Sequence, residues 1–97
     1  MKECSTLNEV RKEIDLVDDQ ILELISERSK YVYQAAKFKN SIEEIKSKER
    51  VDYVVNRIRH QALMRGLSPN MVSEIYRKMI EDMVEIEIAE FKNATSL

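Results

Sequence analysis

The sequence has very few of the residues that turn or interrupt a chain, with one glycine and one proline in 97 residues. Because these two residues mark many turns, there is room for few turns, and we expect a helical protein. The single cysteine, Cys4, excludes an internal disulfide and suits a reducing compartment. No apolar run approaches roughly 18 residues and no signal-peptide core is present, so the sequence predicts a soluble, cytoplasmic protein.

The sequence also lacks the usual signatures of metal, nucleotide and covalent chemistry. His60 is the only histidine and has no second histidine or cysteine to share a metal, so we expect an exposed helical residue and no metal site. There is no glycine-rich phosphate loop and no Ser/His/Asp or Cys/His set. The net charge of −2 argues against a nucleic-acid or membrane-surface binder. An enzyme of this composition would hold and polarise its substrate without a covalent step.

The longest uninterrupted stretch, residues 7–39, has apolar residues at steps of three and four. A Thr6-Leu7-Asn8-Glu9 capping box marks its start and predicts a helix over 6–39. Such a helix spans about 50 Å, which is too long for a compact globule of this size. Its period near 3.5 residues favours packing against a second copy, so we predict a homodimer. The seam consists of Leu7, Val10, Ile14, Val17, Ile21, Leu24, Tyr31, Ala35 and Phe38.

Two further helices complete an all-α architecture of three helices, long, short and long, in one domain over residues 1–97. The second is predicted over 48–65, with Gly66 as its left-handed cap. The third is predicted over 69–91, with Ser68 as N-cap and Pro69 as first helical residue.

Two shorter segments complete the chain. Residues 40–48 are predicted to form a loop, although their Glu and Lys content would allow a helical turn. Residues 93–97 are expected to fray.

Several ionisable residues occupy or border apolar positions. Arg28 stands where the seam requires an apolar residue, Arg11 and Lys39 flank it, and Glu87 falls in an apolar stripe of the third helix. Burying an unpaired charge costs several kcal/mol, so each needs a partner or a purpose. Taken singly, these residues are explained by salt bridges with nearby acids or by exposed head groups.

In an antiparallel helix pair, however, the Arg11 end of one copy would meet the Lys39 end of the other. Two symmetric cationic pockets for a small dicarboxylate would result.

Five motifs together carry a family resemblance that covers about residues 6–91. They are Leu7-x-x-Val10-Arg11-x-x-Ile14-Asp15-x-x-Asp18, Glu27-Arg28, Ala36-Lys37-Phe38-Lys39, Glu49-Arg50-Val51 and Ile80-Glu81-Asp82-Met83-Val84-x-x-Glu87. Their series resembles the small all-helical chorismate mutases of type II fold. The resemblance implies an intertwined homodimer of three-helix chains. It also implies the cofactor-free Claisen rearrangement of chorismate to prephenate.

The resemblance further implies roles for individual residues. Arg28, with Arg11 of the second copy, would bind the two substrate carboxylates. Lys39 would donate to the ether oxygen as its C–O bond breaks. Arg50 matches a family arginine near the substrate, and Glu87 stands where many members have a glutamine that donates to the same ether oxygen. A carboxylate there would oppose the developing negative charge, so Glu87 is expected to be protonated during turnover.

Three other substrate-binding positions depart from the typical mutase. Ser47 replaces an aspartate, Val51 replaces a glutamate and Met83 replaces a common serine. The Glu-Arg-Val version is similar to isochorismate-pyruvate lyases, which make salicylate and pyruvate but keep the glutamine. Glutamate with Arg-Val also resembles mutases acting on 4-amino-4-deoxychorismate. A non-catalytic helical dimer, with its seam charges paired internally, is the alternative from another class.

Overall fold

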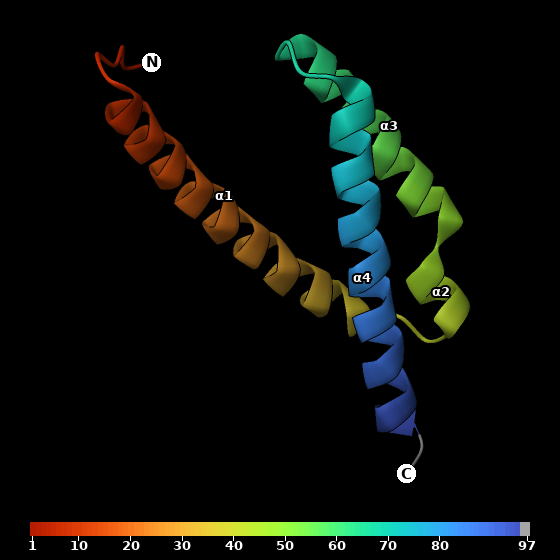
Figure 1. The fold of residues 1–97 in the computed structure, drawn as a ribbon. Helices are drawn as coiled ribbons and strands as arrows, with labels where there is room; N and C mark the ends of the chain where they lie inside the picture. Colours follow the sequence, from red (N-terminus) through yellow and green to blue (C-terminus); the bar gives the residue numbers. More distant parts are fainter. Residues whose placement is uncertain (96–97) are drawn as a thin grey trace. The chain divides into compact units, whose positions relative to one another are not determined.

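A computed structural model describes residues 1–95, and within this range the chain contains helices and no strand. The helices are α1 (Leu7–Ala36), α2 (Ile42–Lys46), α3 (Lys48–Met64) and α4 (Pro69–Thr95) (Figure 1). The predicted all-α order of a long, a short and a long helix is therefore confirmed. The additional α2 is a single short turn inside the predicted loop. The chain divides between Val32 and Tyr33 into two compact units.

Capping interactions begin α1 at the predicted position. The Glu9 N–H donates to Thr6 Oγ1 at 3.2 Å, as the capping box requires. The Glu9 carboxylate accepts from the Ser5 N–H at 2.8 Å, one residue before the Thr6 amide that the capping box predicts. Both interactions satisfy amides that a helix start leaves unpaired. The start is confirmed, and only the reach of the Glu9 side chain differs.

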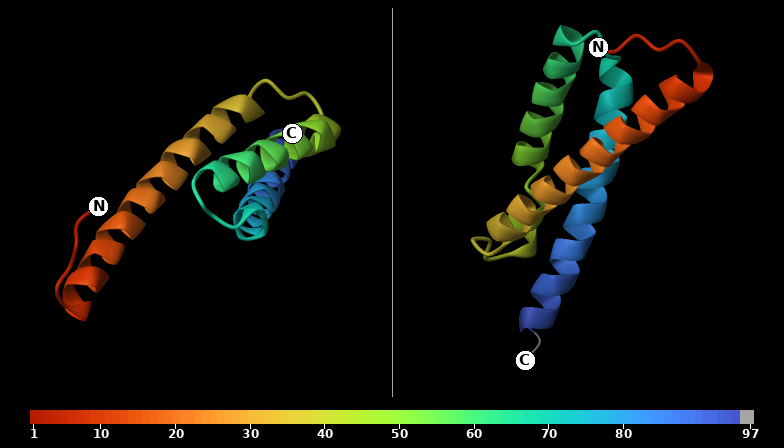
Figure 2. Two further views of the ribbon diagram at one scale, coloured as in Figure 1. Left: turned by 90° about the horizontal axis from the view of Figure 1, so that it is seen from above. Right: turned by 90° about the vertical axis from the view of Figure 1, so that its left-hand side faces the viewer.

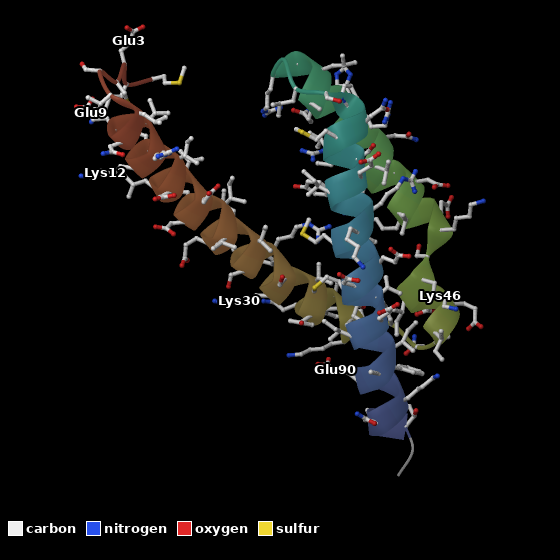
Figure 3. All side chains as sticks on the ribbon, in the orientation of Figure 1. Glu3, Glu9, Lys12, Lys30, Lys46 and Glu90 are labelled. Carbon is white, nitrogen blue, oxygen red and sulfur yellow. The ribbon has the colours of Figure 1, made fainter. Side chains whose placement is uncertain are left out.

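The apolar seam of α1 is exposed in the single chain. No residue of α1 is buried, and side chains project on all sides of its ribbon, Lys12 and Lys30 among them (Figure 3). A helix with so broad an apolar stripe normally buries it against another surface. The seam residues that are 40–64% exposed are Leu7, Val10, Ile14, Val17, Ile21, Leu24 and Tyr31.

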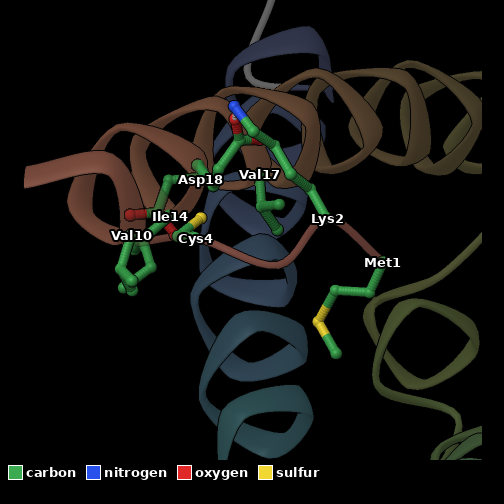
Figure 4. A pocket seen from close by; sticks show the side chains of 8 residues that line it. Met1, Lys2, Cys4, Val10, Ile14, Val17 and Asp18 are labelled. Carbon is green, nitrogen blue, oxygen red and sulfur yellow. Dashed lines mark hydrogen bonds and ion pairs between the residues drawn. The ribbon is translucent and has the colours of Figure 1, made fainter. Parts of the chain in front are cut away.

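The residues before α1 fold back along its first turns (Figure 4). Lys2 Nζ forms an ion pair with Glu13 Oε1 at 3.2 Å. Both side chains are well exposed, so this pair contributes little to stability. Met1 and Cys4 line a shallow apolar cavity along the first three turns of the seam.

α1 ends three residues before the predicted end at Lys39. The N–H groups of Lys37, Phe38 and Lys39 donate to carbonyls three residues earlier, at 3.1–3.2 Å. Such bonds tighten the last turn and end the helix. Phe38, predicted as a seam residue, is 83% exposed in this turn. Lys39 consequently lies outside α1.

The short helix α2 owes its start to a capping box. Ser41 Oγ accepts from the Glu44 N–H at 3.1 Å, and the Glu44 carboxylate accepts from the Asn40 N–H at 2.6 Å. Ile45 in this helix is 4% exposed, and α2 packs against α4. The connection after α1 is thus an ordered helical turn, the alternative that its composition allowed.

α3 and α4 form an antiparallel hairpin and lie side by side (Figures 1 and 2). Ser47 caps α3 by accepting from the Arg50 N–H at 3.4 Å, and Ser68 caps α4 by accepting from the Met71 N–H at 3.2 Å. Gly66, with φ of 70°, forms the predicted left-handed cap between them. These boundaries confirm the sequence interpretation to within one residue.

The inner face of the hairpin holds a small apolar core, and one arginine forms side-chain hydrogen bonds between the two helices. Val55 and Ala62 of α3 are 2% exposed, and Met83 of α4 is 9% exposed. The Arg59 guanidinium donates to Asn70 Oδ1 at 2.9 Å and to the buried Ser73 Oγ at 3.0 Å. This pair of bonds fixes the turn end of α3 to the first turn of α4.

The far end of α4 differs from its predicted course. The helix continues to Thr95, whose hydroxyl donates to the Phe91 carbonyl at 2.9 Å, so residues 93–95 do not fray as predicted. Residues 96 and 97 lie outside the described part. Asp82 is exposed and accepts from Lys78 Nζ at 3.0 Å. This hydrogen bond raises the pKa of Lys78.

Candidate active site

The centre of the candidate site is an ion pair between residues that lie 48 positions apart in the sequence. Lys39 Nζ donates to Glu87 Oε2 at 3.2 Å. The Glu87 side chain is 2% exposed, whereas that of Lys39 is 26% exposed. Since an isolated charge at a buried position costs several kcal/mol, Lys39 compensates the Glu87 carboxylate. The ammonium remains open on its other side to solvent or to a ligand.

Three local features place this pair. The tight turn after α1 carries Lys39 out of that helix, and the capped α2 follows at once. Glu87 lies on α4 one turn after Met83, and both residues are buried on the same face of the helix. The sequence placed Glu87 in an apolar stripe, and the structure buries it there. The residue that neutralises it comes from a different part of the chain.

The start of α3 supplies the second group of predicted site residues. Ser47 is the N-cap of this helix, so its hydroxyl is engaged with the Arg50 amide. Val51 is half-buried, and the exposed Arg50 guanidinium lies 5.2 Å above the centre of the Tyr53 ring. A cation at this distance is attracted by the ring face. The sequence interpretation did not include Tyr53, although its spacing of three residues from Arg50 signals a helical neighbour.

The remaining predicted residues belong to α1 within the first unit of the chain. Arg11 is exposed and Arg28 is half-buried. Seventeen residues separate them, which corresponds to about 25 Å along a helix. One small dicarboxylate cannot span that distance. Within one chain the structure therefore does not bring Arg11 and Arg28 together.

Two properties of the described residues limit the kinds of site that this chain offers. Within residues 1–95 no group of three or more His, Cys, Asp or Glu side chains could hold a metal ion. In the same range no helix is long and apolar enough to cross a membrane.

The fold and the site define a small all-helical protein in which a buried acid of α4 is paired with a partly exposed ammonium from the turn after α1. A family model described as chorismate mutase type II matches residues 10–95. A chorismate mutase from Methanocaldococcus jannaschii is 36% identical over 76 residues, which are 77% of each protein. The chain belongs to the chorismate mutase type II family, as its motifs predicted.

Proposed function

We propose that this protein converts chorismate to prephenate without a cofactor, as a homodimer with two shared active sites. The observation that carries the proposal is the pairing of the buried Glu87 with Lys39 in a chain of this family. Substrate conversion is a Claisen rearrangement, in which one C–O bond breaks as one C–C bond forms. Charge moves onto the ether oxygen in the transition state, so catalysis by positioning and electrostatics suffices.

The separation of the two arginines supports the shared site. Arg28 of one copy and Arg11 of the other would each bind one substrate carboxylate, because a single chain holds them about 25 Å apart. The exposed seam of α1 supplies the apolar surface for such a dimer. We propose that residues 1–97 act as one domain of this assembly.

Charge complementarity also supports the dimer. Residues 1–27 contain three basic and eight acidic side chains, whereas residues 46–78 contain eight basic (His60 not counted) and three acidic ones. The acidic segment 1–27 of one copy would therefore attract basic residues of the other. Opposite potentials of this kind accelerate association and fix its register.

In the proposed reaction Lys39 stabilises the breaking bond. Its partly open ammonium would turn from Glu87 to the ether oxygen and donate a hydrogen bond as negative charge develops there. Such a donor in a dry site is worth roughly 2.7–4 kcal/mol of transition-state stabilisation. Arg50, held over Tyr53, would bind the substrate from the side of α3.

The same movement decides the protonation of Glu87. Once Lys39 turns to the substrate, an ionised Glu87 would be a buried carboxylate beside a developing oxyanion. A proton on Glu87 removes that repulsion and supplies a second donor to the ether oxygen. We therefore propose that the substrate complex reacts in the form in which Glu87 carries a proton.

Three neighbours would shape the pocket around the ring. Val51 and Met83 present apolar surface at positions where the typical mutase is polar, and the hydroxyl of Ser47 is already engaged as a helix cap. The pocket of this chain would consequently hold the ring more by shape than by hydrogen bonds. We place the protein in the cytoplasm, since its lone cysteine suits a reducing compartment.

The decisive experiment incubates the purified protein with chorismate, isochorismate and 4-amino-4-deoxychorismate in parallel. We expect prephenate from chorismate as the main product. Salicylate fluorescence from isochorismate, without prephenate, would instead identify a lyase, and preferential turnover of the amino substrate would identify the third activity. A protein that converts none of them, and whose melting temperature a dicarboxylate transition-state mimic does not raise, would be a non-catalytic dimer. Sedimentation at micromolar concentration tests the dimer separately, and a folded monomer would contradict it.

A further inference from the structure

A second cavity lies at the turn end of the α3–α4 hairpin, and the proposed mechanism does not use it. Its volume is about 330 Å³, near the lower end of small-molecule sites. Val72 and Tyr76 of α4 form one wall at a spacing of four residues, and Ala62, 2% exposed, closes the floor. Ile58 and Leu67 complete its apolar lining.

The opposite wall of this cavity is basic and polar. Arg57, Gln61 and Arg65 follow one another at four-residue spacing, so they stand on one face of α3 and its C-cap. The lining residues described include no acid, so two positive charges face the cavity without a carboxylate beside them. Positive charge on apolar, low-dielectric walls strengthens the local electric field and attracts anions.

The two arginines also have nitrogen atoms available for a ligand. Arg65 uses Nη1 for the carbonyl and the side-chain oxygen of Gln61, which orients its guanidinium and leaves Nη2 for another acceptor. Within residues 1–95, no hydrogen bond or ion pair engages Arg57. A planar guanidinium binds a carboxylate through two parallel hydrogen bonds.

This cavity is separate from the Lys39–Glu87 pair. Tyr76 in its wall precedes Glu87 on α4 by eleven residues, which corresponds to about 16 Å along the helix. A molecule small enough for the cavity cannot reach both places. The two sites can therefore be altered independently.

We propose that this cavity, lined by Arg57, Arg65 and Tyr76, is a second binding site for small carboxylates with an apolar ring. The carboxylate binds the arginines, and the ring lies against Val72 and Ala62. A phosphate fits less well, since most of the lining is apolar and offers no cradle of backbone amides. The proposal does not depend on the activity proposed above.

The test titrates benzoate into the intact protein and follows backbone amide chemical shifts by NMR. We expect saturable shifts centred on Ala62, Leu67 and Val72, and much weaker binding of benzyl alcohol, which has the ring but no charge. Arg57→Gln should weaken benzoate binding about tenfold, the effect of losing one charge-assisted hydrogen-bonded contact. Arg65→Gln should act similarly and supports the result if Arg57→Gln disturbs folding.

Two control variants make the result specific. Arg77→Gln removes the same charge from an exposed position of α4 outside the cavity, and it should leave benzoate affinity unchanged. Lys39→Gln alters the proposed active site and should leave the shifts around Ala62 in place. Shifts confined to Lys39 and Glu87, equal binding of benzyl alcohol, or equal weakening by Arg77→Gln would each overturn the proposal. An absence of shifts at Ala62 would also overturn it, as expected if the second copy covers the cavity.

Discussion

Lys39 Nζ and Glu87 Oε2 lie 3.2 Å apart, although 48 residues of chain separate them. This contact ties the turn after α1 to the inner face of α4, and it neutralises the most buried ionisable side chain among the described ion pairs. The contact therefore has a structural role and a proposed catalytic role. Substitutions that separate the two roles should affect stability and activity differently.

Lys39→Ala tests the catalytic effect against the structural one. Loss of one donor to the ether oxygen should lower kcat by about two orders of magnitude or more. The same variant leaves Glu87 buried without its ammonium, so the free energy of unfolding should also fall. Steady-state kinetics and urea denaturation measure the two quantities separately.

The double variant Lys39→Ala/Glu87→Gln is the matched control. Glutamine carries no charge, so the double variant should recover much of the lost stability while kcat stays low. If kcat recovered together with stability, the activity loss in Lys39→Ala would be a folding effect. A change in KM with kcat unaltered would make Lys39 a binding residue only.

The pH profile tests the proposed protonation of Glu87. An ionised Glu87 opposes charge on the ether oxygen, so kcat of the wild type should rise as the pH is lowered from neutral into the acidic range. Glu87→Gln supplies a permanent donor of similar shape, and its profile should be flat over the same range. Measurements of kcat at saturating chorismate for both proteins decide the matter. A wild-type rate that is independent of pH and unchanged by the substitution would remove this role of Glu87.

The Arg50–Tyr53 contact predicts a modest effect on substrate binding. Tyr53→Leu removes the aromatic face below the guanidinium and should raise KM two- to fivefold, the value of about 0.5–1 kcal/mol for an exposed cation–π pair. Its kcat should change little, and Tyr53→Phe should restore KM, since the ring alone makes the contact. Equal KM values for the wild type and Tyr53→Leu would show that the ring does not position Arg50.

The helix starts and stops were largely predictable because their signals are local. Ser47, Ser68 and Gly66 each act within four residues of their own position, and the structure places all three as predicted. Ser41 and Glu44 form a capping box with the same signature, so α2 was predictable on the same grounds. The end of α1 was harder to predict from the sequence, since no glycine or proline marks it and backbone hydrogen bonds alone close the turn.

The sequence predicted which residues belong to the site better than it predicted the contacts between them. A count of apolar positions on α4 placed Glu87 on a buried face, which the structure confirms. The same reasoning placed Lys39 on the face of α1 beside Arg28, because it took the helix three residues too far. The Lys39–Glu87 contact depends on the packing of α2 and α4, which no local pattern encodes. The exposed seam of α1 has no partner surface in the single chain, and a second copy covers it only in the proposed dimer.

Mixing two inactive variants tests the shared site most directly. Arg11→Ala and Arg28→Ala should each reduce activity strongly, because each removes one carboxylate contact from both sites of the dimer. In a mixed dimer, one site would combine the intact Arg28 of one chain with the intact Arg11 of the other. After unfolding and refolding an equal mixture, about a quarter of wild-type activity should return, since half the dimers are mixed and each has one good site.

A second mixture supplies the control for this experiment. Arg28 and Lys39 are proposed to act from the same chain, so Arg28→Ala mixed with Lys39→Ala should regain no activity, because a mixed dimer would have an intact site only if the two residues came from different chains. With both residues in one chain, every site of that mixed dimer lacks either Arg28 or Lys39, and the regain should be absent. Recovery in this second mixture, or none in the first, would contradict the proposed division of the site between the two copies.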